Sequence, residues 1–212
     1  MTKPTLILDV ETYSNYFMVG FLNTETGNLK QFEMWPDGDG SEGAGFESGQ
    51  AFNRDAVASI LHKYRTVSFN GNNYDMPMIS AALRGADCAK LKALSDKIIV
   101  NNIKHWNLGI EIVKCDHVDI FEVAPGMASL KIYGGRLHCK KMQDLPIEPG
   151  ATITAEDRAL LRTYNGNDLT TTKELWDYLQ PQIELREQMS KVYGIDLRSK
   201  SDAQIAEAVI EE

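Results

Sequence analysis

Three short runs rich in β-forming residues open the chain and constrain its fold more than any other feature. They are TLILDV, YFMVGFL and LKQFEMW, which begin at residues 5, 16 and 29 and are separated by short polar stretches. Runs of this length and spacing are typical of consecutive strands. The opening of the chain therefore predicts an antiparallel meander.

The rest of the chain alternates helical patterns with short strands. We expect, in chain order, a helix capped by Asn53, a strand over 66–70, a helix with Pro77 in its first turn, a strand over 117–123, a short helix interrupted at Gly134 and Gly135, and two helices within 154–193 that meet near Pro181. This order predicts an α/β fold, with a mixed β-sheet of antiparallel meander and parallel strands flanked by helices. The Gly-rich acidic stretch 36–49 is expected to be a mobile loop, because Asp37, Asp39 and Glu42 match a calcium loop only in part.

Size, charge and cysteine content narrow the class of protein. The 212 residues suit one large domain with or without an appendage, and no apolar run approaches the ~20 residues needed to cross a membrane. Three irregularly spaced cysteines are typical of free thiols in a reducing compartment, which predicts a cytoplasmic protein. The net charge of −8 argues against nucleic acid as a partner, unless the acids cluster around divalent cations.

Two acids in the first strand, Asp9 and Glu11, lie one residue apart. Side chains on a strand repeat every two residues, so both carboxylates face the same side, about 6.6 Å apart along the chain. At an effective dielectric near 20 their repulsion amounts to roughly 2.5 kcal/mol. Either both acids are solvated, or a cation lies between them.

Two later stretches supply candidate partners for these acids. Asp75 follows a predicted strand and begins a helix, where the helix dipole favours an anion, although a simple helix-terminal acid is an equally good reading. Tyr164 and Asp168 are four residues apart in a helical segment and share one face. The residues between them, Asn-Gly-Asn, are poor helix formers, which indicates either close approach of a ligand or another backbone, or a kink between two short helices.

Together these residues resemble the three motifs of the DEDD superfamily of 3′–5′ exonucleases, tyrosine subclass. The motifs are Asp9-x-Glu11, Asp75 and Tyr164-x-x-x-Asp168, and the resemblance covers roughly residues 5–180. The second motif is similar to the proofreading form Asn-x-x-x-aromatic-Asp-x-Pro, here Asn70, Tyr74, Asp75 and Pro77. The stretch HVDIFEVAPGMASLKIYGGRLHCKKMQDLP further resembles the exonuclease domain of phage-type DNA polymerases.

The resemblance implies a ribonuclease H-like fold and metal-dependent removal of nucleotides from single-stranded or frayed DNA 3′ ends, as in polymerase proofreading in a phage or bacterium. Asp9, Glu11, Asp75 and Asp168 are then the ligands of two Mg²⁺ or Mn²⁺ ions. Tyr164 is the fifth catalytic residue, and it orients the attacking water rather than acting as a base, because a free tyrosine has a pKa near 10.

Other implied features concern substrate and partners. Thr12, Asn70 and Tyr74 are expected to bind the terminal nucleotide, and Lys131, Arg136, Lys140 and Lys141 either steer phosphates or form an ordinary solvated surface. The alternatives are an RNA-trimming 3′–5′ exoribonuclease and a non-catalytic module that binds DNA or docks a polymerase. We expect residues 1–194 to form the exonuclease domain and 195–212 to begin a connecting helix toward a polymerase domain outside this chain.

Overall fold

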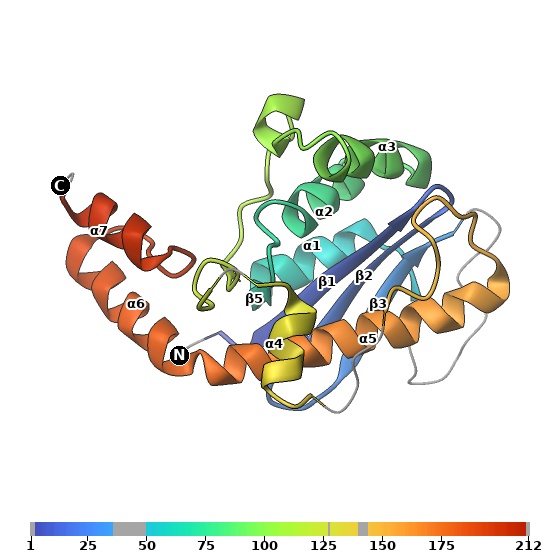
Figure 1. Ribbon diagram of the computed structural model, residues 1–212. Helices are drawn as coiled ribbons and strands as arrows, with labels where there is room; N and C mark the ends of the chain where they lie inside the picture. The colour runs from blue at the N-terminus through green and yellow to red at the C-terminus, as the bar shows by residue number, and fades with distance from the viewer. Residues whose placement is uncertain (1–2, 36–49, 127, 140–143, 211–212) are drawn as a thin grey trace.

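A mixed sheet of six strands forms the centre of the computed structural model, which describes residues 3–35, 50–126, 128–139 and 144–210 (Figure 1). The strand order is β4-β3-β2-β1-β5-β6. The bounds are β1 Thr5–Tyr13, β2 Tyr16–Asn23, β3 Leu29–Met34, β4 Gln50–Ala51, β5 Arg65–Ser68 and β6 His117–Asp119. The first three strands are antiparallel neighbours, and β5 and β6 continue the sheet beside β1 as parallel strands. The predicted α/β class and meander are confirmed, and the arrangement is consistent with a ribonuclease H-like fold.

Helices cover both faces of this sheet (Figure 1). One face carries α1 (Arg54–Lys63), α2 (Asp75–Leu83) and α3 (Cys88–Ile99), and the other carries α4 (Leu130–Arg136) and α5 (Ala155–Tyr178). A short 3₁₀ helix (His105–Leu108) follows α3, and α6 (Gln180–Tyr193) and α7 (Asp202–Ile210) end the described chain. None of the helices in the described ranges is both long and apolar enough to span a membrane.

The alternation of side chains along β1 places the acids relative to these layers. Leu6, Leu8 and Val10 pack in one core cluster with α1, α2 and α3. Ile7 packs in a second cluster with α4 and α5. Because the side chains of a strand alternate between its faces, Asp9 lies on the same face as Ile7, toward α5.

Several predicted helix ends and boundaries are confirmed. The Asn53 side chain caps α1 by accepting a hydrogen bond from the backbone N–H of Ala56 at 2.9 Å. Pro181 lies in the first turn of α6, where its missing N–H leaves no hydrogen bond unmade. The N-terminus of α5 is fixed by a reciprocal capping box between Thr154 and Asp157.

Several expectations differ from the structure, and the strand predicted over 66–70 runs from Arg65 to Ser68. The strand predicted over 117–123 ends at Asp119, because the Asp119 carboxylate accepts the backbone N–H of Phe121 and turns the chain. The helix predicted to break at Gly134 and Gly135 is continuous, since the Tyr133 hydroxyl anchors it by donating to the Pro125 carbonyl at 2.9 Å. Helix α3 was not predicted at all. The loop predicted at 36–49, with its partial calcium-loop pattern, lies outside the described residues.

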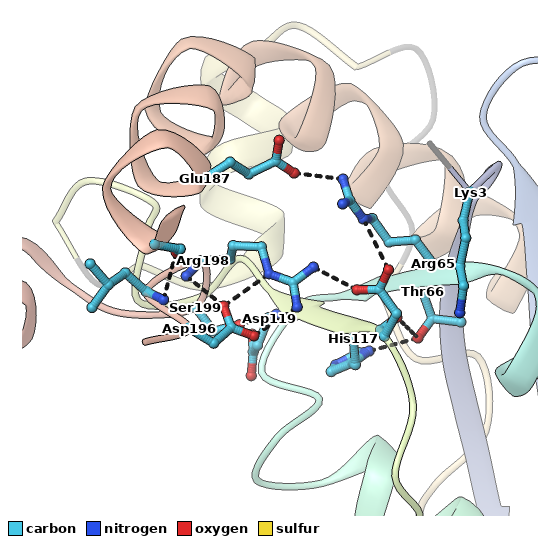
Figure 2. Close-up of polar contacts among 12 residues, drawn as sticks. Lys3, Arg65, Thr66, His117, Asp119, Glu187, Asp196, Arg198 and Ser199 are labelled. Carbon is cyan, nitrogen blue, oxygen red and sulfur yellow. Dashed lines mark hydrogen bonds and ion pairs between the residues drawn. The ribbon is translucent and has the colours of Figure 1, made fainter. Parts of the chain in front are cut away.

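The segment between α6 and α7 packs against the edge of the sheet through polar contacts (Figure 2). Arg198 forms ion pairs with Asp196 and with Asp116, and the backbone N–H of Asp119 donates to the Ser199 hydroxyl at 2.9 Å. Leu197, between them, is fully buried. The segment predicted to begin a connecting helix at residue 195 therefore starts with residues that lie against the edge of the sheet, and its connection to a further domain stays a prediction.

Replacing Arg198 with alanine is expected to lower the free energy of unfolding by about 2 kcal/mol, since two carboxylates lose a partly buried, hydrogen-bonded partner. Urea denaturation of the whole chain measures this change. Arg84→Ala is the control, because Arg84 pairs with Glu111 on the surface, where an ion pair contributes less than ~1 kcal/mol. Equal stability of the two variants would contradict the structural role of this segment.

Candidate active site

A pocket of about 620 Å³ opens beside the second half of β1. All five side chains predicted to be catalytic line it: Asp9, Glu11, Asp75, Tyr164 and Asp168. They come from three elements: β1, the start of α2 and the middle of α5. Asp9 and Asp168, the first and last of them, are 159 residues apart in the chain. The sheet and α5 thus bring together the motifs that the sequence separates.

The early end of β5 creates the space for Asp75. β1 pairs with β5 only from Thr5 to Ile7, so the later edge of β1 on that side has no strand partner among the described residues. The Asp75 carboxylate occupies this edge and accepts the Val10 backbone N–H at 3.1 Å. Asp75 itself is buried at the first turn of α2, where the helix dipole favours its charge.

Three of the acids form a compact cluster. Asp9, Glu11 and Asp168 each present a carboxylate oxygen, and these oxygens lie within 4.8 Å of one another. Asp75 lines the same pocket but is not a member of this trio. Glu11 is buried, and the other two are half-buried, so water screens their repulsion only in part.

Burial raises the pKa of each of the four acids predicted to bind metal. The pKa values of Asp9 and Glu11 rise well above their ordinary range, first because burial disfavours the charged form and then because neighbouring carboxylates repel it. Burial raises the pKa of Asp75 to about 7 and that of Asp168 to about 6. Without a cation, therefore, the cluster resists full ionisation at neutral pH.

Tyr164 lies one helical turn before Asp168 and is 8% exposed. Burial and the adjacent carboxylates raise the pKa of its hydroxyl, so it stays protonated at any physiological pH. Its hydrogen bond to Asp168 lowers the pKa of that carboxyl and fixes the hydroxyl at the pocket. A protonated phenol can donate a hydrogen bond but cannot accept a proton as a general base.

The three residues predicted to bind the terminal nucleotide are placed differently. Asn70 and Tyr74 line the pocket, and Thr12 is not among its lining residues. Asn70 adopts a left-handed backbone (φ 65°), held there because its N–H donates to Asp119 at 2.8 Å. The Tyr74 hydroxyl is hydrogen-bonded to Ser95 at 2.9 Å, which ties it to α3. Contact of these residues with a substrate stays a prediction.

Some residues of the pocket were missed from the sequence. Phe121 lines it, with its ring 5.3 Å from the Phe69 ring in an edge-to-face pair. Ile98, Ile99 and Lys104 also line it, because α3 and the segment after it form one wall. Phe121 lies two residues after the end of β6, and the sequence does not predict its role as a wall because that role depends on where β6 lies in the sheet.

The predicted basic cluster is described only in part, because Lys140 and Lys141 lie outside the described residues. Lys131 forms an ion pair with the exposed Asp144 at 2.8 Å, and its charge also lowers the pKa of Asp168. Arg136 lies over the ring of Tyr133, 5.8 Å from its centroid. Lys131 is thus close enough to the acidic pocket to influence it.

Comparison of the sequence with known protein families and with curated proteins finds no match. The chemistry of the pocket therefore has to follow from its residues. An all-carboxylate set of ligands, two of them half-buried and one buried, suits a hard divalent cation such as Mg²⁺ or Mn²⁺.

Proposed function

We propose that the chain is a metal-dependent 3′–5′ exonuclease that removes nucleotides from single-stranded or frayed DNA 3′ ends and proofreads for a DNA polymerase. The observation that supports this most is the approach of Asp9, Glu11 and Asp168 to within 4.8 Å in a pocket also lined by Asp75 and Tyr164. The same five residues are the ones that match the motifs of the DEDD exonucleases in the sequence. The proposal places the protein in the cytoplasm, with the replication machinery of a phage or bacterium.

The residues fit divalent cations by charge and by donor type. Asp9, Glu11 and Asp168 would hold one ion, and Asp9 and Asp75 a second. Bound Mg²⁺ or Mn²⁺ would neutralise the phosphate, lower the pKa of the attacking water and stabilise the leaving oxygen. Burial raises the pKa values of Asp9 and Glu11 most, and repulsion by the neighbouring carboxylates raises them further. Cations of opposite charge would offset that repulsion.

The remaining residues supply orientation and shape. The protonated Tyr164 hydroxyl, anchored at Asp168, is positioned to hydrogen-bond the attacking water. Phe69 and Phe121 form an apolar wall on which a terminal base can stack. Lys104 lines the pocket and provides a positive charge for the phosphate backbone.

The direct test is digestion of a single-stranded DNA oligonucleotide labelled at its 5′ end, with Mg²⁺ or Mn²⁺ present. We expect a ladder of products that shorten from the 3′ end, and no products when EDTA removes the metal. A 3′-blocked oligonucleotide is the control for direction. Cleavage that persists in EDTA, or internal cuts in the blocked substrate, would contradict the proposal.

Two other functions give different results in the same assay. Faster digestion of a matched RNA oligonucleotide would identify an RNA-trimming exonuclease, because the same acids can hydrolyse either backbone. Binding of the DNA oligonucleotide without cleavage in either metal would identify a non-catalytic DNA-binding or polymerase-docking module. The presence of all four acids in one pocket favours an enzyme.

Replacing Tyr164 with phenylalanine is expected to lower the cleavage rate by roughly 10–100-fold and to leave measurable activity. The change removes one hydrogen bond to the attacking water but keeps the acids in place. Single-turnover cleavage of the labelled oligonucleotide measures the effect. Tyr178→Phe is the matched control, because Tyr178 is exposed on the same helix, and it is expected to cleave normally. Complete loss in Tyr164→Phe would require the phenol to do more than orient water.

A further inference from the structure

The fully buried Asn165 connects helix α5 to the acidic cluster. Its side-chain amide donates a hydrogen bond to Asp9, with 2.8 Å between Asn165 Nδ2 and Asp9 Oδ2. Asn165 belongs to the Asn-Gly-Asn sequence that is unfavourable for a helix, yet α5 runs through it without a break. The side chain of Asn165 thus gives a reason for the unfavourable residue, and the alternative of two short helices does not hold.

A second amide fixes the orientation of the first. Gln31, on β3, is 1% exposed, and its Nε2 donates to the Asn165 side-chain oxygen at 3.0 Å. The same Nε2 donates to the backbone carbonyl of Arg162 at 2.8 Å. The Gln31 oxygen accepts no hydrogen bond from the described residues, so none of them favours the reversed amide.

The polarity of this chain of hydrogen bonds is set at both ends. A backbone carbonyl, here that of Arg162, can only accept, so the NH₂ group of Gln31 has to face it. Asn165 must then turn its oxygen to Gln31 and its NH₂ group to Asp9. An ionised carboxylate also can only accept, so the arrangement is consistent from end to end.

A glycine in the sheet provides the space that the hydrogen-bonded side chains of Gln31, Asn165 and Asp9 require. Gly20 on β2 is the register partner of Asp9. A Cβ atom there would lie 2.0 Å from the Asn165 side-chain oxygen and 2.8 Å from Leu169 Cδ1. Atoms cannot approach so closely, so a side chain at this position would push Asn165 away from Asp9. By contrast, a Cβ on Gly166 would meet only Leu29 at 3.5 Å, an ordinary contact.

We propose that Gln31 and Asn165 form a positioning relay that holds one oxygen of Asp9 and directs the other toward the divalent cation. The inference rests on the proposed metal centre and adds to it two residues that do not line the pocket. Outer residues that orient a metal ligand typically change metal affinity 10–100-fold when they are replaced. A merely structural tie between α5 and β3 would alter stability and leave the affinity unchanged.

Gln31→Glu is the most informative variant, because it keeps the shape of the side chain and removes its NH₂ group. Two acceptors then face the Arg162 carbonyl and Asn165, so Asn165 is expected to reverse and present its oxygen to Asp9. Isothermal titration of the whole chain with Mn²⁺ is expected to give a Kd at least ~10-fold weaker than that of the native protein. Gln204→Glu makes the same chemical change at an exposed position on α7 and should bind Mn²⁺ normally.

Asn165→Ala tests the same relay without introducing a buried charge, and alanine is the best helix former for a position within α5. It is also expected to weaken Mn²⁺ binding about 10-fold. In this background Gln31→Glu should cause no further loss, because Gln31 acts only through Asn165. Circular dichroism and thermal unfolding verify that each variant is folded, and the Asn165→Ala result stands even if Gln31→Glu does not fold.

The outcomes separate this inference from the proposed function. A native protein that binds no Mn²⁺ overturns both. A native protein that binds Mn²⁺ while folded Asn165→Ala binds it equally well overturns only the relay. Equal losses from Gln31→Glu with and without Asn165 would also overturn it, because Gln31 would then act by another route.

Discussion

Replacing Asp9 with asparagine is expected to lower the rate of oligonucleotide hydrolysis by roughly 10⁴-fold or more, to the background of the assay. Asp9 is the acid expected to contact both cations, and it is repelled by Glu11, Asp75 and Asp168 alike. The change removes a charged ligand and keeps the size of the side chain. Single-turnover cleavage of the 5′-labelled oligonucleotide in Mn²⁺ measures the loss.

The same substitution is expected to stabilise the protein when metal is absent. Two charges 4.8 Å apart repel by about 3 kcal/mol at an effective dielectric near 20, and the neutral amide introduced by Asp9→Asn removes one of these charges. We expect Asp9→Asn to raise the Tm in EDTA by roughly 5 °C, a size set by relief of part of this repulsion. Activity and stability should therefore change in opposite directions.

Asp177→Asn is the control for this experiment. Asp177 lies on the same helix as Asp168, but its carboxylate is exposed and pairs with Lys173 at the surface. Neither cleavage nor Tm should change appreciably, because an exposed ion pair contributes little. Cleavage by Asp9→Asn within about tenfold of the native rate would show that the pocket is not the hydrolytic site.

The metal-free protein is expected to gain stability as the pH falls from about 7.5 to about 5, through the acids of this pocket. The pKa of Asp75 is raised from 3.8 to about 7 in the folded protein. Between these two values the folded state binds a proton that the unfolded state does not. The stabilising contribution is thus complete below the unfolded pKa and is lost as the pH rises through about 7.

A comparison with Asp75→Asn isolates this contribution from the others. His117 has the opposite effect, because burial lowers its pKa to about 4 and the unfolded state takes up its proton first as the pH falls. We expect urea denaturation in EDTA to show the following difference as the pH falls from about 7.5 to about 5. The free energy of unfolding of the native protein rises by roughly 2 kcal/mol more than that of Asp75→Asn. Parallel pH profiles for the two proteins would contradict the raised pKa of Asp75.

Bound Mn²⁺ is expected to have the opposite pH dependence, because it should stabilise the protein more as the pH rises. Metal ligands have to be deprotonated, so Mn²⁺ is expected to raise the Tm of the native protein more at about pH 7.5 than at about pH 5. Acids that merely shared protons, without binding a cation, would show no such increase at either pH.

Much of the site was predictable because its residues obey short-range rules. Asp9 and Glu11 face the same side since strands repeat every two residues, and Tyr164 and Asp168 share a face since helices repeat every three to four. The structure brings all four to one pocket with Asp75. The unfavourable helix sequence around Asn165 indicates close approach of a ligand or another backbone, or a kink, whereas the structure shows a hydrogen bond to the Asp9 side chain.

Other features depend on contacts between distant segments. Helix α4 continues through Gly134 because tertiary contacts of Tyr133 outweigh the weak helix propensity of glycine. The strand expected over 117–123 stops at Asp119, whose carboxylate also accepts the N–H groups of Asn70 and Asn72. This carboxylate therefore shapes a loop that lies 49 residues earlier in the chain, at Asn70.

Local patterns along the chain were enough to define the class of fold, the order of most elements and which acids face one way, because periodicity and capping act over a few residues. Packing between distant segments was needed to establish that β5 ends early enough for Asp75 to reach β1, and that Gly20 leaves space for Asn165 beside Asp9. Both features depend on distances between residues that are far apart in the chain. Hydrogen bonds and van der Waals contacts are sensitive to a few tenths of an ångström in such distances, and a local sequence pattern carries no information about them.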